Sequence, residues 1–112
     1  MFKIENEKII IAEKTLTFPF PVQEYVEIGN MLVVLLKIPP KTIYDQNVFG
    51  VDIEEQNIKW QIGKHNWTEA ILGSPYISLD FNNNNVYVIN WNGFYVVVNP
   101  NTGEAIEKVI TK

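Results

Sequence analysis

The stretch Asn85–Ile110, NVYVINWNGFYVVVNPNTGEAIEKVI, decides the fold of this chain because it contains two hairpin signals in succession. The first is Asn92-Gly93 between two apolar runs, a pair that tolerates positive φ at both centres of a type I′ turn. The second is the turn at 99–103, where Pro100 restricts φ and Gly103 can adopt the left-handed conformation that ends the turn. Residues 104–110 then return as a more polar strand, which we expect at a sheet edge.

A two-residue loop at Asn92-Gly93 also predicts the register of the hairpin, since cross-strand neighbours are counted outward from the turn. Both predicted faces carry apolar side chains, so we expect the hairpin to be covered on both sides. Trp91, Phe94 and Tyr87 are therefore expected in the core, together with Trp60. The predicted cross-strand pairs are Trp91/Phe94, Ile89/Val96 and Tyr87/Val98 on one face and Asn90/Tyr95, Val88/Val97 and Val86/Asn99 on the other.

The composition favours one globular domain without disulfides. The chain has 112 residues, of which 46% are hydrophobic, and it contains no Cys, which excludes thiolate catalysis and Cys-ligated zinc. A net charge of −4 argues against nucleic acid as a partner. The longest apolar run, Met31–Leu36, is far too short to span a bilayer. The first residues lack the pattern of a signal peptide, so we expect a cytoplasmic protein that does not bind membranes.

The rest of the chain also follows a strand pattern, apart from a short helical turn predicted near 66–72, where Asn66 and Glu69 resemble a capping box. Met31–Ile38 is the most apolar segment and is expected as a central strand. The sequence thus predicts one all-β domain of about ten short antiparallel strands, arranged as blade-like sheets or a sandwich. The other predicted strands are Phe2–Ile4, Lys8–Ala12, Lys14–Phe18, Gln23–Ile28, Val48–Glu54, Ile58–Ile62 and Tyr76–Phe81.

Two segments forty-seven residues apart form an internal repeat, VFGVDIEEQNIKWQI and YVVVNPNTGEAIEKV. Each reads as an apolar strand, a polar turn and an amphipathic return strand, with a period typical of β-propeller blades. The turn at 99–104 resembles the Asp-x-x-Thr-Gly-Lys turn of pyrroloquinoline-quinone-type repeats, which are WD40-like blades, and Asp52 with Trp60 resembles the Asp and Trp of that repeat. The resemblance implies blade-like sheets and an interaction scaffold. It also extends to small uncharacterised bacterial proteins with a similar pair of hairpins.

This resemblance does not imply a quinone-binding site in this chain, because the chain departs from the repeat at several positions. Asn99 replaces the Asp, Gln56 occupies the place of the turn Gly, and Glu107 replaces the second Trp. Tryptophan docking, which joins successive blades in that family, is therefore implied only for Trp60. Two or three blades cannot close a propeller ring, so apolar sheet faces need another cover.

The chain lacks a recognisable catalytic pattern. His65 is its only histidine and has no metal-ligand spacing to an acid. Ser74 or Ser78 with His65 and Asp80 would supply the residue types of a triad, but no Gly-x-Ser-x-Gly motif marks a nucleophile. A glycosidase pair could be drawn from the acids, although sequence does not show their separation. We therefore expect a protein that is not an enzyme and needs neither cofactor nor metal.

We expect a non-enzymatic protein-interaction module of the adaptor or immunity type, whose binding face comprises Tyr44, Asp45, His65 and Trp67. These residues are predicted in irregular segments, where binding residues concentrate on rigid sheets. The alternative is a carbohydrate-binding domain, since Trp67 and Tyr44 with nearby Asn and Asp suit sugar stacking and hydrogen bonding. The uncovered sheet faces also predict a symmetric homodimer, with a monomer closed by its N-terminal strands as the alternative.

Overall fold

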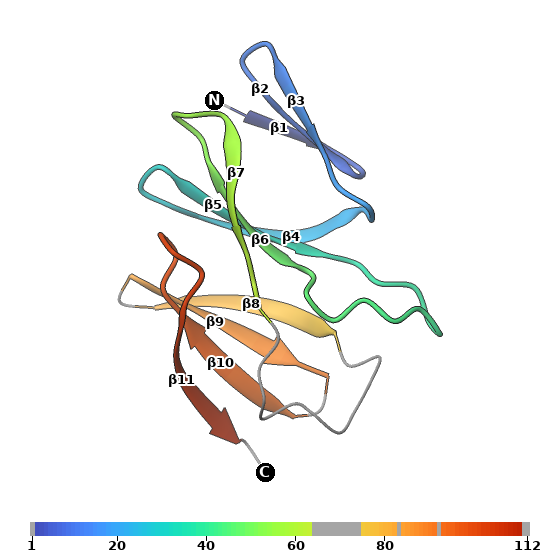
Figure 1. Ribbon diagram of the computed structural model, residues 1–112, viewed down its shortest axis with the longest axis vertical. Helices are drawn as coiled ribbons and strands as arrows, with labels where there is room; N and C mark the ends of the chain where they lie inside the picture. The colour runs from blue at the N-terminus through green and yellow to red at the C-terminus, as the bar shows by residue number, and fades with distance from the viewer. Residues whose placement is uncertain (1, 64–74, 83, 92, 111–112) are drawn as a thin grey trace.

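The computed structural model describes residues 2–63, 75–82, 84–91 and 93–110. These residues form eleven antiparallel strands and no helix, as the sequence predicted for the fold class (Figure 1). No helix in this described part is long and apolar enough to cross a membrane. The strands are β1 Phe2–Glu5, β2 Lys8–Ile11, β3 Lys14–Thr17, β4 Val22–Ile28, β5 Met31–Leu36, β6 Val48–Asp52, β7 Asn57–Gln61, β8 Tyr76–Asn82, β9 Asn85–Asn90, β10 Phe94–Val98 and β11 Ala105–Ile110.

Three sheets follow one another along the chain. The N-terminal sheet has the order β1-β2-β3, the central sheet β4-β5-β6-β7 and the C-terminal sheet β8-β9-β10-β11. Within each sheet, strands that are consecutive in sequence pair with one another. Figure 1 shows the sheets from the N-terminal one at the top to the C-terminal one at the bottom. They form neither a closed barrel nor a propeller ring.

The central sheet is buried on both faces because of β5, whose six residues are all buried. Successive side chains of a strand point to opposite faces. Leu32 and Val34 therefore pack with the N-terminal sheet, while Val33 and Leu35 pack with the C-terminal sheet. This confirms the prediction of a central strand. A two-residue loop, Gly29-Asn30, precedes it, since Ile28 pairs with Met31.

The N-terminal strands cover one face of the central sheet. Ile9, Ile11 and Phe18 are buried and belong to the same cluster as Leu32 and Val34. The backbone also joins the two sheets, since the amide of Val22 donates to the carbonyl of Asn6 at 2.8 Å. One apolar face is thus closed within the chain.

The register predicted for the β9–β10 hairpin is wrong by one residue. Val96 pairs with Val88 and Tyr95 with Ile89, so the loop holds three residues, 91–93, instead of two. The amide of Gly93 donates to the carbonyl of Asn90 at 3.0 Å, and Gly93 has φ of +89°. A three-residue loop also ends in a left-handed residue, usually Gly, and for this reason the Asn-Gly pair did not distinguish the two loop lengths.

This displacement changes which side chains share a face. Val88 and Val96 lie together in the core with Phe94, and Tyr87 and Ile89 are half-buried on the other face. Trp91, predicted as a core residue, is 66% exposed. The core prediction is confirmed for Trp60 and Phe94 and wrong for Trp91. It is also wrong for Tyr87, which belongs to neither core cluster of the described residues.

The two repeated segments occupy equivalent places in their sheets. β6 and β7 are the third and fourth strands of the central sheet, and β10 and β11 are the third and fourth strands of the C-terminal sheet. β11 lies at a sheet edge, as predicted. The helical turn predicted near 66–72 lies outside the described residues.

Candidate functional site

Trp60 on β7 joins the central sheet to the β10–β11 turn. Its indole Nε1–H donates a hydrogen bond of 2.8 Å to the carbonyl of Pro100. The ring lies against two glycines, since a Cβ atom would be 2.1 Å from the indole at Gly50 and 2.4 Å from it at Gly103. No Cβ atom fits at such distances, so both positions require glycine for the two sheets to meet here.

Asn47 makes the second joint between these sheets. Its fully buried side-chain amide donates to the carbonyls of Leu36 and Tyr76, both at 2.9 Å, and accepts from the amide of Tyr76 at 3.0 Å. One side chain thus takes the place of a strand partner for Tyr76 at the start of β8. Sequence reasoning missed this residue, which is marked only as a polar residue directly before an apolar strand.

Two predicted site residues, Tyr44 and Asp45, lie next to these joints and are partly buried. The Tyr44 ring packs edge-on against Phe20, with centroids 5.1 Å apart, and its hydroxyl accepts a hydrogen bond from the Gln61 amide at 3.2 Å. One carboxylate oxygen of Asp45, Oδ1, is buried and makes no hydrogen bond in the described structure. Burial raises the pKa of the Tyr76 hydroxyl, and the Asp45 carboxylate raises it further.

The other two predicted site residues, His65 and Trp67, lie outside the described residues. Of the four residues predicted for the binding face, the structure therefore places Tyr44 and Asp45. Within the described ranges, no group of three or more His, Cys, Asp or Glu side chains is placed to hold a metal ion.

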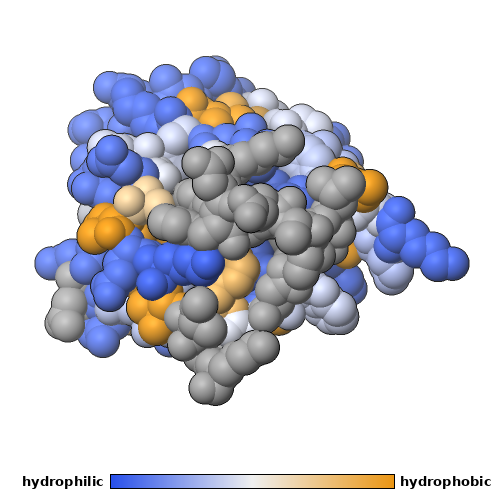
Figure 2. All heavy atoms as spheres, turned by 60° about the horizontal axis from the view of Figure 1, so that its bottom comes forward, coloured by the Kyte–Doolittle hydropathy of each residue, from blue (hydrophilic) through white to orange (hydrophobic). Residues whose placement is uncertain are grey.

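An apolar hollow of about 440 Å³, which we call the Trp91 groove, includes Lys41 and Thr42 from the segment that leads to Tyr44 and Asp45. Trp91 is 66% exposed and Ile77 is 44% exposed, and the amide of Trp91 donates to the carbonyl of Pro75 at 3.1 Å. The groove joins the segment after β5 to the start of β8 and the β9–β10 loop. Its lining consists of Ile38, Pro39, Pro40, Lys41, Thr42, Pro75, Ile77 and Trp91. The view of the lower end of the molecule shows hydrophobic patches among hydrophilic residues (Figure 2).

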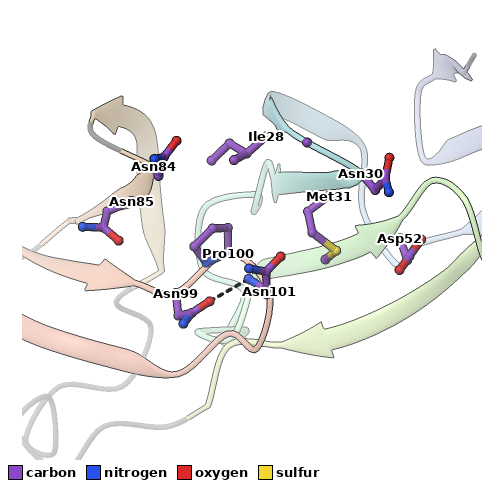
Figure 3. A pocket seen from close by; sticks show the side chains of 10 residues that line it. Ile28, Asn30, Met31, Asp52, Asn84, Asn85, Asn99, Pro100 and Asn101 are labelled. Carbon is purple, nitrogen blue, oxygen red and sulfur yellow. Dashed lines mark hydrogen bonds between the residues drawn. The ribbon is translucent and has the colours of Figure 1, made fainter.

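A second hollow, of about 490 Å³, lies where hairpin turns of the central and C-terminal sheets meet (Figure 3). We call it the turn hollow, because its residues come from the β4–β5, β8–β9 and β10–β11 turns and from the end of β6. Five of these residues are Asn and one is Asp. The lining consists of Ile28, Gly29, Asn30, Met31, Asp52, Asn84, Asn85, Asn99, Pro100 and Asn101.

Sequence reasoning identified neither hollow, although it placed most of their turns correctly. One of these turns joins β8 to β9, where Asn82 pairs with Asn85. That this turn lies near Asn101 depends on how the sheets pack, which no local pattern encodes. Trp91 was recognisable only as a large residue next to a turn, and the wrong register placed it in the core.

The comparison with known families extends over nearly the whole chain. The family model described as "Domain of unknown function (DUF7957)" matches residues 1–110. No match was found among curated proteins. Because the family match covers all but the last two residues, this chain belongs to the DUF7957 family.

Proposed function

We propose that this protein is a non-enzymatic, cytoplasmic protein-interaction module that binds its partner through the Trp91 groove. The observation that carries the proposal is the 66% exposure of Trp91 beside the exposed Ile77. A solvent-exposed tryptophan leaves a large apolar surface in contact with water. At protein interfaces, tryptophan is enriched among the residues that contribute most of the binding free energy.

The frame around the groove supports a binding role. Pro39, Pro40 and Pro75 have restricted φ angles, so their segments lose little conformational freedom when a partner orders them. Asn47 holds the two sheets together beside the groove. In many proteins the sheets form a rigid scaffold and the loops carry the binding residues, as proposed here for the loops that line the groove.

The lining also indicates the chemistry of the partner. Lys41 is the one charged residue of the described lining, and the remaining residues are apolar except for Thr42. We therefore propose a partner segment that inserts an apolar side chain against Trp91 and presents an acidic residue to Lys41. The blade-like order of the three sheets supports an interaction scaffold, since each sheet is an antiparallel meander.

The test is partner capture from the source lysate with the wild-type chain and Trp91→Ala as baits. Removal of the exposed indole should weaken binding of the purified partner by about 30-fold or more, as expected when a dominant interface residue is truncated. Phe81→Ala is the matched control, because Phe81 is a 46% exposed aromatic residue that does not line the groove.

Unfolding curves for both variants should match the wild type, since neither side chain is buried.

Equal binding of the partner by wild type and Trp91→Ala would rule out this groove as the interface. Alanine at Trp67 and Tyr44 tests the binding face expected from sequence. Tyr44→Ala also removes the ring contact with Phe20, so its stability must be measured alongside.

A further inference from the structure

We propose that the turn hollow is a second binding site, for a neutral ligand rich in hydroxyl groups, of which a saccharide is the chemical class. Its volume of about 490 Å³ falls in the range of small-molecule sites, about 300–1,000 Å³. Among the described residues, it shares none of its lining with the Trp91 groove. Tyr44 and Asp45 do not belong to its described lining either.

The Asn side chains of the turn hollow divide into those that the fold uses and those that it does not. Asn99 Oδ1 accepts from the amide of Asn101 at 2.8 Å, which stabilises the β10–β11 turn. The Asn30 amide makes a long contact of 3.4 Å with Glu54. Among the described residues, the side-chain amides of Asn84 and Asn101 make no hydrogen bond to the protein. These two amides come from two different turns of the C-terminal sheet, β8–β9 and β10–β11, and both line the same hollow, where they are available to a ligand.

The charge of the lining selects the ligand class. Asp52 is the one ionisable residue of the described lining, and its Oδ1 already accepts from the backbone amide of Glu55 at 2.9 Å. No Lys or Arg belongs to this described lining, so phosphates and carboxylates would find no counter-charge there. A calcium ion usually takes several carboxylates among six to eight oxygen ligands, and a single Asp does not supply them.

The geometry suits a molecule with both hydroxyl groups and C–H faces. Each Asn amide offers two donors and an acceptor, so it can hold two neighbouring hydroxyls at once. Met31, Pro100 and Ile28 provide the apolar part of the lining. Figure 3 shows Pro100 and Met31 between Asn84 on one side and Asn30 with Asp52 on the other, so polar groups flank an apolar centre.

The test is a titration followed by NMR with methyl-labelled methionine and amide-labelled asparagine. The chain has two methionines, and Met31 lines the hollow, so its methyl signal reports directly on occupancy. The probes are glucose, galactose, mannose, N-acetylglucosamine, maltose and cellobiose, each in buffer with EDTA. We expect at least one of them to shift the Met31 methyl and the Asn84 and Asn101 amide signals.

Asn84→Gly combined with Asn101→Ala should raise the dissociation constant about tenfold or more, because two amides are lost. Gly at 84 preserves the positive φ of 66° that Asn84 adopts. Asn82→Ala is the matched control, since Asn82 is exposed in the same hairpin and does not line the hollow.

A flat response to all six saccharides would overturn the proposal. Shifts that leave the Met31 methyl signal unmoved, or binding that the double variant leaves unchanged, would overturn it too. Calcium chloride alone is tested in buffer without EDTA. If it shifted the same signals, the hollow would be a cation site and the saccharide proposal would be overturned. Trp91→Ala should leave the saccharide response intact, which keeps this test distinct from that of the partner interface.

Discussion

Glycine residues in this chain serve two different physical purposes. Gly93 has φ of +89° and open space where a Cβ would lie, so only its backbone conformation requires glycine. Gly50 lies against the Trp60 ring, which leaves no room for any side chain. Gly103 combines both constraints, with φ of +76° and a ring contact. A substitution therefore tests a different interaction at each position.

Gly93→Ala is predicted to lower the free energy of unfolding by about 1–2 kcal/mol, the penalty for an L-residue in the left-handed region. Gly63→Ala is the matched control, since Gly63 also has open space around it but no positive φ. It should be neutral or stabilising by up to about 1 kcal/mol through the unfolded chain. Denaturant unfolding measures both, and equal midpoints for the two variants would contradict the left-handed conformation of Gly93.

Tyr76 is predicted to make stability depend on alkaline pH. Its pKa in the folded protein is raised, first by burial and then by the Asp45 carboxylate. Its contribution to stability is therefore complete below the unfolded pKa of about 10 and decreases as the pH rises above that value, because the unfolded chain releases the proton first. The slope is about 1.4 kcal/mol per pH unit.

Unfolding curves between about pH 9 and pH 11.5 would show this decrease, given the reference value for tyrosine. Tyr76→Phe should remove this contribution, and Asp45→Asn should reduce it. If the stability of the wild type and that of Tyr76→Phe changed equally with alkaline pH, the raised pKa of Tyr76 would be contradicted.

At the scale of elements, the structure depends on side chains that replace missing strand pairing. β4 and β8 are neighbours without a shared ladder, and Glu24 on β4 accepts from the amide of Leu79 on β8 at 2.8 Å. Gln23 donates to the carbonyl of Ile77 at 3.2 Å. With Asn47, these residues form a polar seam between the central and C-terminal sheets.

Asn47→Ala is predicted to destabilise the protein by about 3 kcal/mol or more, because it leaves the carbonyl of Leu36 and both backbone groups of Tyr76 without partners. Gln46→Ala is the control, since Gln46 donates one partly buried hydrogen bond, to Ile62 at 3.0 Å, and should cost about 1 kcal/mol. Chemical denaturation distinguishes the two. If both variants lost similar stability, Asn47 would not be the main joint of the seam.

At the scale of the whole molecule, the two ends of the stack differ in polarity. The N-terminal sheet exposes Lys3 and Glu5, which form an ion pair at 3.0 Å. On the C-terminal sheet, Tyr87, Ile89 and Tyr95 lie on the face opposite Val88 and belong to neither core cluster of the described residues. A polar end is typical of a capping unit, whereas an apolar end favours a further layer.

We predict that a second copy covers this apolar end in a symmetric homodimer. Light scattering at micromolar concentration should give about twice the chain mass of 12.9 kDa. Tyr95→Glu should reduce the mass to that of one chain by placing a charge on the face, whereas Ile58→Glu, on the exposed part of β7, should not. A mass near 12.9 kDa for the wild type across a tenfold dilution would exclude the dimer.

The sequence predicted the elements well and the relations between elements poorly. Met31–Leu36 could be identified as a central strand because an unbroken apolar run of that length has few other solutions. The Asn92-Gly93 pair marked a turn, but it suits two loop lengths that differ by one residue. That single residue exchanged the faces of the hairpin and moved Trp91 from the expected core to the surface.

The sequence by itself determined the all-β class, the antiparallel order of neighbouring strands and the positions of the turns, because alternation and turn residues act over a few positions. Only the tertiary structure decided that Trp60 meets Gly103, that Asn47 pairs with Tyr76, and that both hollows lie between segments distant in sequence. Such contacts depend on how sheet faces pack. The same apolar pattern is compatible with many packings, and side-chain shape and polar satisfaction select one of them.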